Sequence, residues 1–199
     1  MTIVVTGASG LLGRQVFAVL SKKYSRDLIG CAYSRSSSKL QKIDLLKANE
    51  TTEFLKSKRP HIVIHCAAER RPDVCNNNHD YTLKMNVDSV RLLAKLAIEL
   101  DYLLIYISTD YVFDGTNPPY IESSTPNPLQ FYGKTKLDGE LAIKEIMQSP
   151  KNTGSYCILR VPVLYGEVEF NGESAINSLV DIVNVNIKGN SGKQAKFSR

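Results

Sequence analysis

Short apolar runs rich in β-branched residues alternate along the chain with longer segments in which apolar positions recur every three or four residues. The first pattern is typical of strands buried on both faces, and the second is typical of amphipathic helices. The expected strands are Thr2–Thr6, Asp27–Tyr33, His61–Cys66, Leu103–Ser108 and Cys157–Pro162. The expected helices are Leu11–Lys23, Thr51–Lys58, Thr82–Leu100 and Thr135–Met147. This alternation predicts βαβ units, and so an α/β fold of the Rossmann type with a doubly wound parallel sheet.

The regular pattern weakens towards the end of the chain. A length of 199 residues suffices for one well-buried domain. After Gly166 the pattern loosens, and residues 189–199 (GNSGKQAKFSR) are typical of a loop or tail. We therefore expect a nucleotide-binding domain at 1–166. Residues 167–199 are expected to begin a smaller C-terminal lobe, most of which is missing, or to form a tail.

Composition narrows the classes of protein. With 43% hydrophobic and 23% charged residues, the chain is typical of globular proteins. No apolar run approaches the ~20 residues of a membrane-spanning helix, and Met1–Thr6 leads into a strand rather than a signal peptide. We expect a protein of the cytoplasm or the nucleus with no membrane partner. The charge of +5 is dispersed, which argues against nucleic acid, and four cysteines without a C-x-x-C pair predict reduced thiols and no metal site.

Three glycines follow the first expected strand at G-x-x-G-x-x-G spacing and lead directly into the first expected helix. In this context Gly7 would allow a tight turn, Gly10 would let the backbone approach a pyrophosphate, and Gly13 would let helix and strand pack closely. The pyrophosphate would then meet the helix N-terminus, where N–H groups and the helix dipole favour anions. The cofactor-binding residues expected here are Thr6, Gly7, Ser9, Gly10, Leu11, Leu12 and Gly13.

The end of the second expected strand distinguishes the two nicotinamide cofactors. An Asp or Glu there would accept hydrogen bonds from the ribose 2′-hydroxyl of NAD(H), but the chain carries Ser34, Arg35 and Ser36 instead. A guanidinium offers charge-assisted, bidentate bonds to a 2′-phosphate, and the hydroxyl of Ser34 or Ser36 would add to them. The sequence therefore favours NADP(H), with NAD(H) as the alternative.

Hydroxyl, phenol and ammonium groups follow the fourth expected strand. Ser108 and Thr109 end this strand, and Tyr132 and Lys136 lie about two dozen residues further on, one helical turn apart. The ammonium is expected to lower the tyrosine pKa, which would make the phenol a general acid or base near neutral pH. A hydroxyl from Thr109 or Ser108 would share the oxygen of a substrate carbonyl with the phenol.

These segments, taken together, resemble the extended short-chain dehydrogenase/reductase superfamily, and within it the dTDP-4-dehydrorhamnose reductase-like branch. The matching strings are TGASGLLG (6–13), HCAA (65–68), STDYVFDG (108–115) and YGKTKLDGE (132–140), together with Asp44-Leu45 and Asn86. The resemblance implies a catalytic trio of Thr109, Tyr132 and Lys136. It also implies that Asp44 and Leu45 flank the adenine, that Cys66, Ala67 and Ala68 line the cofactor, that Asn86 supports the site, and that Arg160 follows the last strand on the cofactor side. The cofactor-binding residues expected in this part of the chain also include Asn86, Ser108, Tyr132, Lys136 and Arg160.

Two further strings, HCAAERRPDV (65–74) and LYGEVE (164–169), resemble the narrower family of regulatory β subunits of methionine adenosyltransferase. That resemblance implies an NADP(H)-binding subunit that binds the catalytic subunit and modulates S-adenosylmethionine synthesis. The alternative is an NADPH-dependent reductase of a nucleotide-linked 4-keto sugar with Tyr132 as proton donor. Arg70 and Arg71 would grip an anionic substrate or an acidic partner surface, or would pair with acidic residues of their own loop.

Overall fold

The computed structural model describes residues 1–35, 38–149 and 152–188 of the chain. The chain divides into two compact units, Met1–Pro162 and Val163–Arg199, and each is described by itself. Ser36 and the predicted tail at 189–199 lie outside the described residues. In the described part, no helix combines the length and the apolar character needed to cross a membrane.

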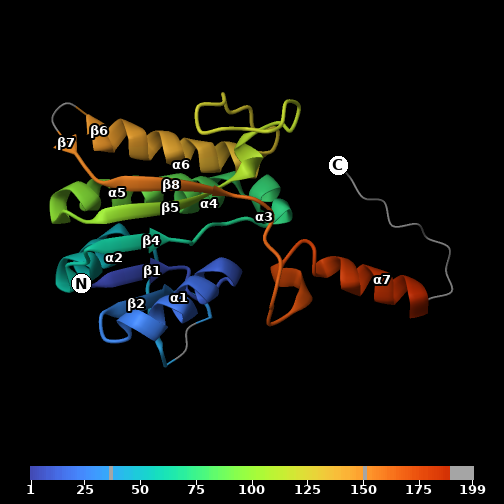
Figure 1. The fold of residues 1–199 in the computed structure, drawn as a ribbon, viewed down its shortest axis with the longest axis horizontal. Helices are drawn as coiled ribbons and strands as arrows, with labels where there is room; N and C mark the ends of the chain where they lie inside the picture. Colours follow the sequence, from blue (N-terminus) through green and yellow to red (C-terminus); the bar gives the residue numbers. More distant parts are fainter. Residues whose placement is uncertain (36–37, 150–151, 189–199) are drawn as a thin grey trace. The chain divides into compact units, whose positions relative to one another are not determined.

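The first unit is built on a sheet of six parallel strands in the order β3-β2-β1-β4-β5-β8 (Figure 1). Such an order, in which the strands run outwards in both directions from β1, is that of a doubly wound dinucleotide-binding fold. The predicted fold class is therefore confirmed. The strands are β1 (Ile3–Thr6), β2 (Leu28–Ala32), β3 (Leu40–Lys42), β4 (Ile62–His65), β5 (Leu103–Thr109) and β8 (Tyr156–Val161).

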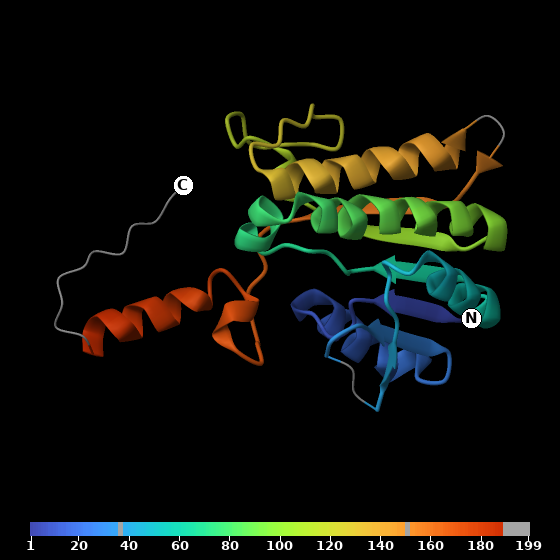
Figure 2. The ribbon, with the colours of Figure 1, turned by 180° about the vertical axis from the view of Figure 1, so that it is seen from behind.

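Helices cover both faces of the sheet, because successive side chains of each strand point to opposite sides. On one face Ile3 and Val5 pack against Phe17 and its neighbours in α1. On the other face Val4, Val63 and Leu104 pack against residues of α2, α5 and α6. Figures 1 and 2 show α1 on one side of the sheet and α2 and α5 on the other. The helices of this unit are α1 (Leu11–Tyr24), α2 (Ala48–Lys58), α3 (Pro72–Asn77), α4 (His79–Leu83), α5 (Ser89–Leu100) and α6 (Phe131–Met147).

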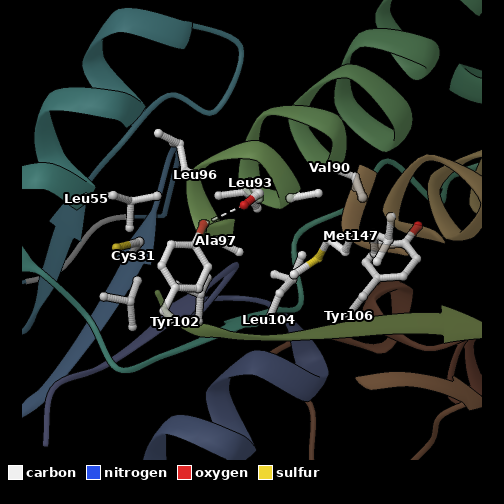
Figure 3. Packing of buried hydrophobic residues seen from close by; sticks show 14 of the residues in the cluster. Cys31, Leu55, Val90, Leu93, Leu96, Ala97, Tyr102, Leu104, Tyr106 and Met147 are labelled. Atoms are coloured by element: carbon white, nitrogen blue, oxygen red, sulfur yellow. Dashed lines mark hydrogen bonds between the residues drawn. The ribbon is translucent and has the colours of Figure 1, made fainter. Parts of the chain in front are cut away.

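The larger core cluster lies between the sheet and the helices α2, α5 and α6. Leu55, Leu93 and Met147 reach into it from the three helices, and each is almost completely buried (Figure 3). Tyr102 is also buried there, and its hydroxyl donates a hydrogen bond of 2.6 Å to the carbonyl oxygen of Leu93. The polar end of this side chain is thus satisfied inside the core, as a buried phenol requires.

The helix predicted at Thr82–Leu100 differs from the observed one at its beginning. Helix α4 precedes it, and a π-helical turn, η1 (Lys84–Asp88), joins α4 to α5. A π-turn adds a residue to the helical repeat and is frequent at functional sites. Here it carries Asn86, whose buried side chain points to the carboxyl edge of the sheet. Helix α6 begins at Phe131, before the predicted Thr135, so that Tyr132 lies in its first turn.

Four of the short elements have no counterpart in the predicted pattern. Strand β3 extends the sheet beyond β2, and α3 forms within the charged loop that follows β4. A hairpin of β6 (Gln148–Ser149) and β7 (Asn152–Thr153) follows α6. Each is too short to show a periodic apolar pattern, which is why the sequence did not reveal it.

The second unit contains a 3₁₀ turn, η3 (Asn171–Glu173), and the helix α7 (Ser178–Lys188). The carboxylate of Glu173 is buried and accepts the N–H of Glu169 at 2.9 Å. The hydroxyl of Ser174 donates to the carbonyl oxygen of Leu164 at 2.8 Å. These bonds close a local loop on which α7 begins.

Candidate functional site

The glycine-rich turn connects β1 to α1 at the carboxyl edge of the sheet, where ligands of doubly wound folds bind. Gly7 has a φ of +67°, and a Cβ on it would lie 2.7 Å from the backbone nitrogen of Ala67. A Cβ on Gly13 would collide with the carbonyl group of Gly7. These two glycines are therefore required by the fold itself.

Gly10 differs from its two neighbours in the motif. Its φ of −79° and ψ of 169° are open to any residue, and a Cβ on it would meet only the carbonyl oxygen of Gly7, at 3.3 Å. Gly10 is the N-cap of α1, no side chain caps this helix, and its first turn holds no acidic residue. A helix N-terminus of this kind is suited to an anion, so the turn fits a pyrophosphate.

The surroundings of the turn fix its position against β2 and β4. The N–H of Ala8 donates to the carbonyl oxygen of Cys31, and the N–H of Cys66 donates to the carbonyl oxygen of Thr6, at 2.9 and 3.2 Å. The Thr6 hydroxyl is buried and shares a hydrogen bond of 2.7 Å with Nδ1 of His65. Thr6 thus contributes its backbone, and Ser9, Leu11 and Leu12 complete the turn as half-buried residues at the start of α1.

The residues predicted to meet the adenosine part lie beyond β2 and β3. Ser34 and Arg35 are exposed directly after β2. Asp44 follows β3, and its carboxylate accepts the N–H of Leu46 at 3.0 Å. Leu45 is half-buried and packs against the larger core cluster. All four therefore lie on the side of the glycine turn where β2 and β3 end.

Replacing Arg35 by Ala is expected to weaken NADPH binding by on the order of tenfold and to leave NADH binding nearly unchanged, because a charged hydrogen bond contributes roughly 1.5–3 kcal/mol. Titration calorimetry with both cofactors measures the two effects. Arg26→Ala is the matched control, since Arg26 is an exposed arginine that precedes β2 at its amino end. Equal losses for NADH and NADPH would contradict the assignment of the 2′-phosphate to Arg35.

Asn86 ties two elements of the site together and does so through all of its polar atoms. Its Oδ1 accepts the N–H of Glu69 at 2.8 Å, and its Nδ2 donates to the carbonyl oxygen of Glu69 and to Oγ1 of Thr135, at 2.9 and 3.0 Å. Thr135 in turn donates to the carbonyl oxygen of Tyr132 at 2.9 Å. Asn86 therefore joins the segment after Cys66, Ala67 and Ala68 to the first turn of α6, as a brace.

The catalytic residues predicted on β5 and α6 lie together. A side-chain hydrogen bond joins Thr109 to Tyr132. Burial raises the pKa of Tyr132 to about 12, whereas the charge of Arg70 and the bond to Thr109 act to lower it. The expectation that Lys136 lowers the pKa of this phenol is therefore wrong. Burial dominates because it disfavours the phenolate, so the phenol keeps its proton and is suited to donate it.

Lys136 lies one turn further along α6 and is only 2% exposed. Its ammonium lies over the ring of Tyr106, with Nζ 4.1 Å from the ring centroid. Burial lowers the pKa of Lys136 to about 7, although the nearby charge of Glu140 acts to raise it. Burial also raises the pKa of Cys66 to about 12, so the neighbouring thiol stays protonated.

Glu140 is a central residue of the site that the sequence reasoning did not single out. It is fully buried and accepts hydrogen bonds from Nε and Nη2 of Arg160 at 2.9 and 2.6 Å and from the hydroxyl of Ser108 at 2.5 Å. Ser108 and Arg160 thus direct their side chains to Glu140, and Thr109 is the hydroxyl residue beside Tyr132. The position one turn after Lys136 could have revealed Glu140 as its counter-charge.

The two arginines after β4 have different surroundings. Arg71 forms a bidentate ion pair with the buried carboxylate of Glu69, at 3.0 and 2.7 Å. Burial acts to raise the pKa of Glu69, but the hydrogen bonds and charge of Arg71 hold it below its ordinary value. Internal pairing of the loop therefore accounts for Arg71, whereas the charge of Arg70 acts on Tyr132.

Comparison with known proteins identifies the family of this chain. A family model described as the RmlD substrate binding domain matches residues 1–186. The chain belongs to this family. The resemblance to the dTDP-4-dehydrorhamnose reductase-like branch, predicted from the motifs, is thereby confirmed. Among solved structures, dTDP-4-dehydrorhamnose reductase from Bacillus anthracis in complex with NADP is 30% identical, with a TM-score of 0.75 over 92% of this chain and 60% of that one.

Curated relatives of this family member share more of its sequence. Methionine adenosyltransferase 2 subunit beta of Bos taurus is 47% identical over 181 residues, or 91% of this chain and 52% of that protein. The subunit of Danio rerio is 45% identical over the same share of the chain. A probable low-salt glycan biosynthesis reductase of Haloferax volcanii is 32% identical over 81% of the chain. The chain spans about half the length of the curated relatives it matches.

Proposed function

We propose that this chain is the cofactor-binding part of a regulatory β subunit of methionine adenosyltransferase. In this function it holds NADP(H), binds the catalytic subunit and modulates S-adenosylmethionine synthesis. The observation that carries the proposal is the 47% identity to the bovine β subunit over 91% of the chain, against 30% to the Bacillus anthracis reductase. The strings ERRPDV and LYGEVE, predicted to mark that subunit, support it.

The structure supports NADP(H) as the ligand through the shape and charge of the turn after β1. Gly7 and Gly13 bring the backbone close to β4 and α1, and Gly10 leaves the uncapped helix end open to a pyrophosphate. Arg35 would meet the 2′-phosphate, and Lys136 and Tyr132 would contact the hydroxyls of the nicotinamide ribose. When bound, the nicotinamide supplies or accepts a hydride.

The second candidate is a reductase of a nucleotide-linked 4-keto sugar, and the arrangement of Thr109, Tyr132 and Lys136 favours it. Thr109 and the phenol of Tyr132 would hydrogen-bond the carbonyl oxygen of the substrate and orient it. Because the pKa of Tyr132 is raised to about 12, this phenol carries a proton at neutral pH and would donate it to the oxygen as the carbonyl is reduced. Lys136 would stabilise the charge that remains on the phenol.

The two candidates are distinguished with the full-length form of the protein. We expect it to co-purify with the catalytic methionine adenosyltransferase of the same organism and to change the rate of S-adenosylmethionine synthesis, more strongly with NADPH present. A Tyr132→Phe variant provides the control, because regulation does not need the phenolic proton. At saturating NADPH, which offsets the lost contact to the ribose, the variant should still co-purify with the catalytic subunit and change the rate of S-adenosylmethionine synthesis.

The opposite result has an equally definite meaning. If the full-length protein does not associate with the catalytic subunit but oxidises NADPH in the presence of a dTDP-linked 4-keto sugar, it is a reductase. Tyr132→Phe should then lower the rate of oxidation by about 100-fold or more, the magnitude of a lost proton donor.

A further inference from the structure

Tyr106 lies directly beneath Lys136 and contacts it in two ways. The ring of Tyr106 faces the ammonium, with 4.1 Å between Nζ and the ring centroid. The hydroxyl of the same side chain donates to the carbonyl oxygen of Lys136 at 3.3 Å. Both residues are at most 2% exposed, so these contacts are made away from water. A cation over an aromatic face is attracted most strongly where it is desolvated.

The neighbours of Tyr106 hold its ring in this place. On β4, His65 is paired with Tyr106 in the sheet and stacks on it, with 5.9 Å between ring centroids and 15° between planes. On α6, Gly139 gives room for the hydroxyl, because a Cβ at this position would lie 2.5 Å from it. Figure 3 shows Tyr106 at the end of the core cluster next to Met147 of α6. The ring is therefore fixed from the sheet and from the helix.

In the described part of the chain, four titratable groups contact the ammonium of Lys136 or interact with its charge: Glu140, His65, Cys66 and Tyr106. Glu140, one turn along α6, is the acidic group whose charge acts to keep Lys136 protonated. Burial lowers the pKa of His65 to about 3, so this ring is neutral. Burial likewise keeps Cys66 and Tyr106 protonated by raising their pKa values. Among these four groups, Tyr106 contacts Lys136 both at Nζ and at its backbone carbonyl oxygen.

We infer that Tyr106 is a positioning residue for Lys136: its ring holds the ammonium at the cofactor edge, and its hydroxyl holds the turn of α6 that carries it. This inference rests on the proposed NADP(H) site, because Lys136 matters to function only where it meets the cofactor. The hydroxyl and the ring of Tyr106 contribute separately to the position of Lys136. Replacement by Phe removes the hydroxyl contact, and fluorination of the ring weakens the contact with the ammonium.

The first test replaces Tyr106 by Phe and by phenylalanines with one, two and three ring fluorines, which weaken the attraction for a cation while nearly preserving volume. We expect Tyr106→Phe to bind NADPH within about threefold of wild type and the fluorinated series to lose affinity stepwise, to on the order of tenfold. The series is repeated in a Lys136→Met background. There the stepwise loss should vanish, because Tyr106 acts through Lys136. Equal losses in both backgrounds would overturn the inference.

The second test uses the protein without cofactor and separates this inference from the proposed function. The pKa of Lys136 is about 7 in the folded chain, whereas the ordinary value of a lysine is 10.5. Between these two pH values the unfolded chain therefore binds more protons than the folded chain. The free energy of unfolding should therefore rise with pH from about 7 upwards. Ring fluorination should move the onset of this rise to lower pH, and Lys136→Met should abolish it.

The outcomes of the two tests are distinct. If fluorination does not shift the pH at which the free energy of unfolding begins to rise, the role of Tyr106 is overturned, whatever the affinity for NADPH. If the wild type binds no NADPH but the onset moves, the cofactor proposal fails and the coupling between Tyr106 and Lys136 stands. Since fluorinated phenylalanines are close to tyrosine in volume, a failure to fold is not the expected result in either test.

Discussion

Replacing Gly10 by Val is expected to weaken NADPH binding by more than about 100-fold, equivalent to roughly 3 kcal/mol, while the chain keeps its fold. The backbone of Gly10 is open to any residue, and a Cβ there meets only the carbonyl oxygen of Gly7. A branched side chain would, however, occupy the space in which the pyrophosphate approaches the N–H groups of α1. Titration calorimetry gives the affinity, and thermal unfolding gives the stability, which should fall by no more than about 1 kcal/mol for a poorer N-cap.

A Gly13→Ala variant provides the contrast within the same turn. Its Cβ would collide with the carbonyl group of Gly7, so we expect a loss of stability of about 1–3 kcal/mol rather than a selective loss of binding. If Gly10→Val binds NADPH like the wild type, the pyrophosphate does not lie on this helix end. If Gly10→Val unfolds as readily as Gly13→Ala, the distinction between the two glycines is wrong.

The sheet could be predicted because its strands are buried on both faces, which leaves continuous apolar runs in the sequence. The runs of β1, β4 and β5 were placed to within a residue or two of their observed bounds. The glycine turn was predicted for a similar reason, since two of its glycines answer a steric demand of the fold. A Cβ on Gly7 would collide with the backbone of Ala67, and a Cβ on Gly13 would collide with the backbone of Gly7.

The roles of the polar residues could not be predicted in the same way, because they depend on which elements meet in space. Ser108 and Arg160 were predicted to bind the cofactor, and the sequence did not reveal that Glu140 on another element accepts hydrogen bonds from both side chains. The pKa of Tyr132 was expected to be low because Lys136 is one turn away. Burial of the phenol, which spacing does not reveal, raises the pKa to about 12.

Replacing Glu140 by Gln is expected to lower the free energy of unfolding by about 3–5 kcal/mol, because removing one member of a buried ion pair leaves the other charge uncompensated. Glu140 is fully buried and Arg160 is 17% exposed, so water replaces little of the lost interaction. The glutamine keeps the shape of the side chain and one acceptor oxygen. Its neutral amide no longer offsets the guanidinium of Arg160, and it removes the charge that acts to keep Lys136 protonated.

The matched control is Glu145→Gln on the same helix. Glu145 pairs with Arg91 at 3.0 Å, but its side chain is 69% exposed, and an ion pair at the surface contributes only about 0–1 kcal/mol. Urea denaturation of both variants measures the difference, and an unchanged slope with urea concentration shows that the unfolded states are comparable. If Glu140→Gln costs no more than Glu145→Gln, the buried pair with Arg160 is not what joins β8 to α6. If it costs several times more, Glu140 links the strand that ends the sheet to the helix that carries Tyr132 and Lys136, and stability and the geometry of the site depend on the same carboxylate.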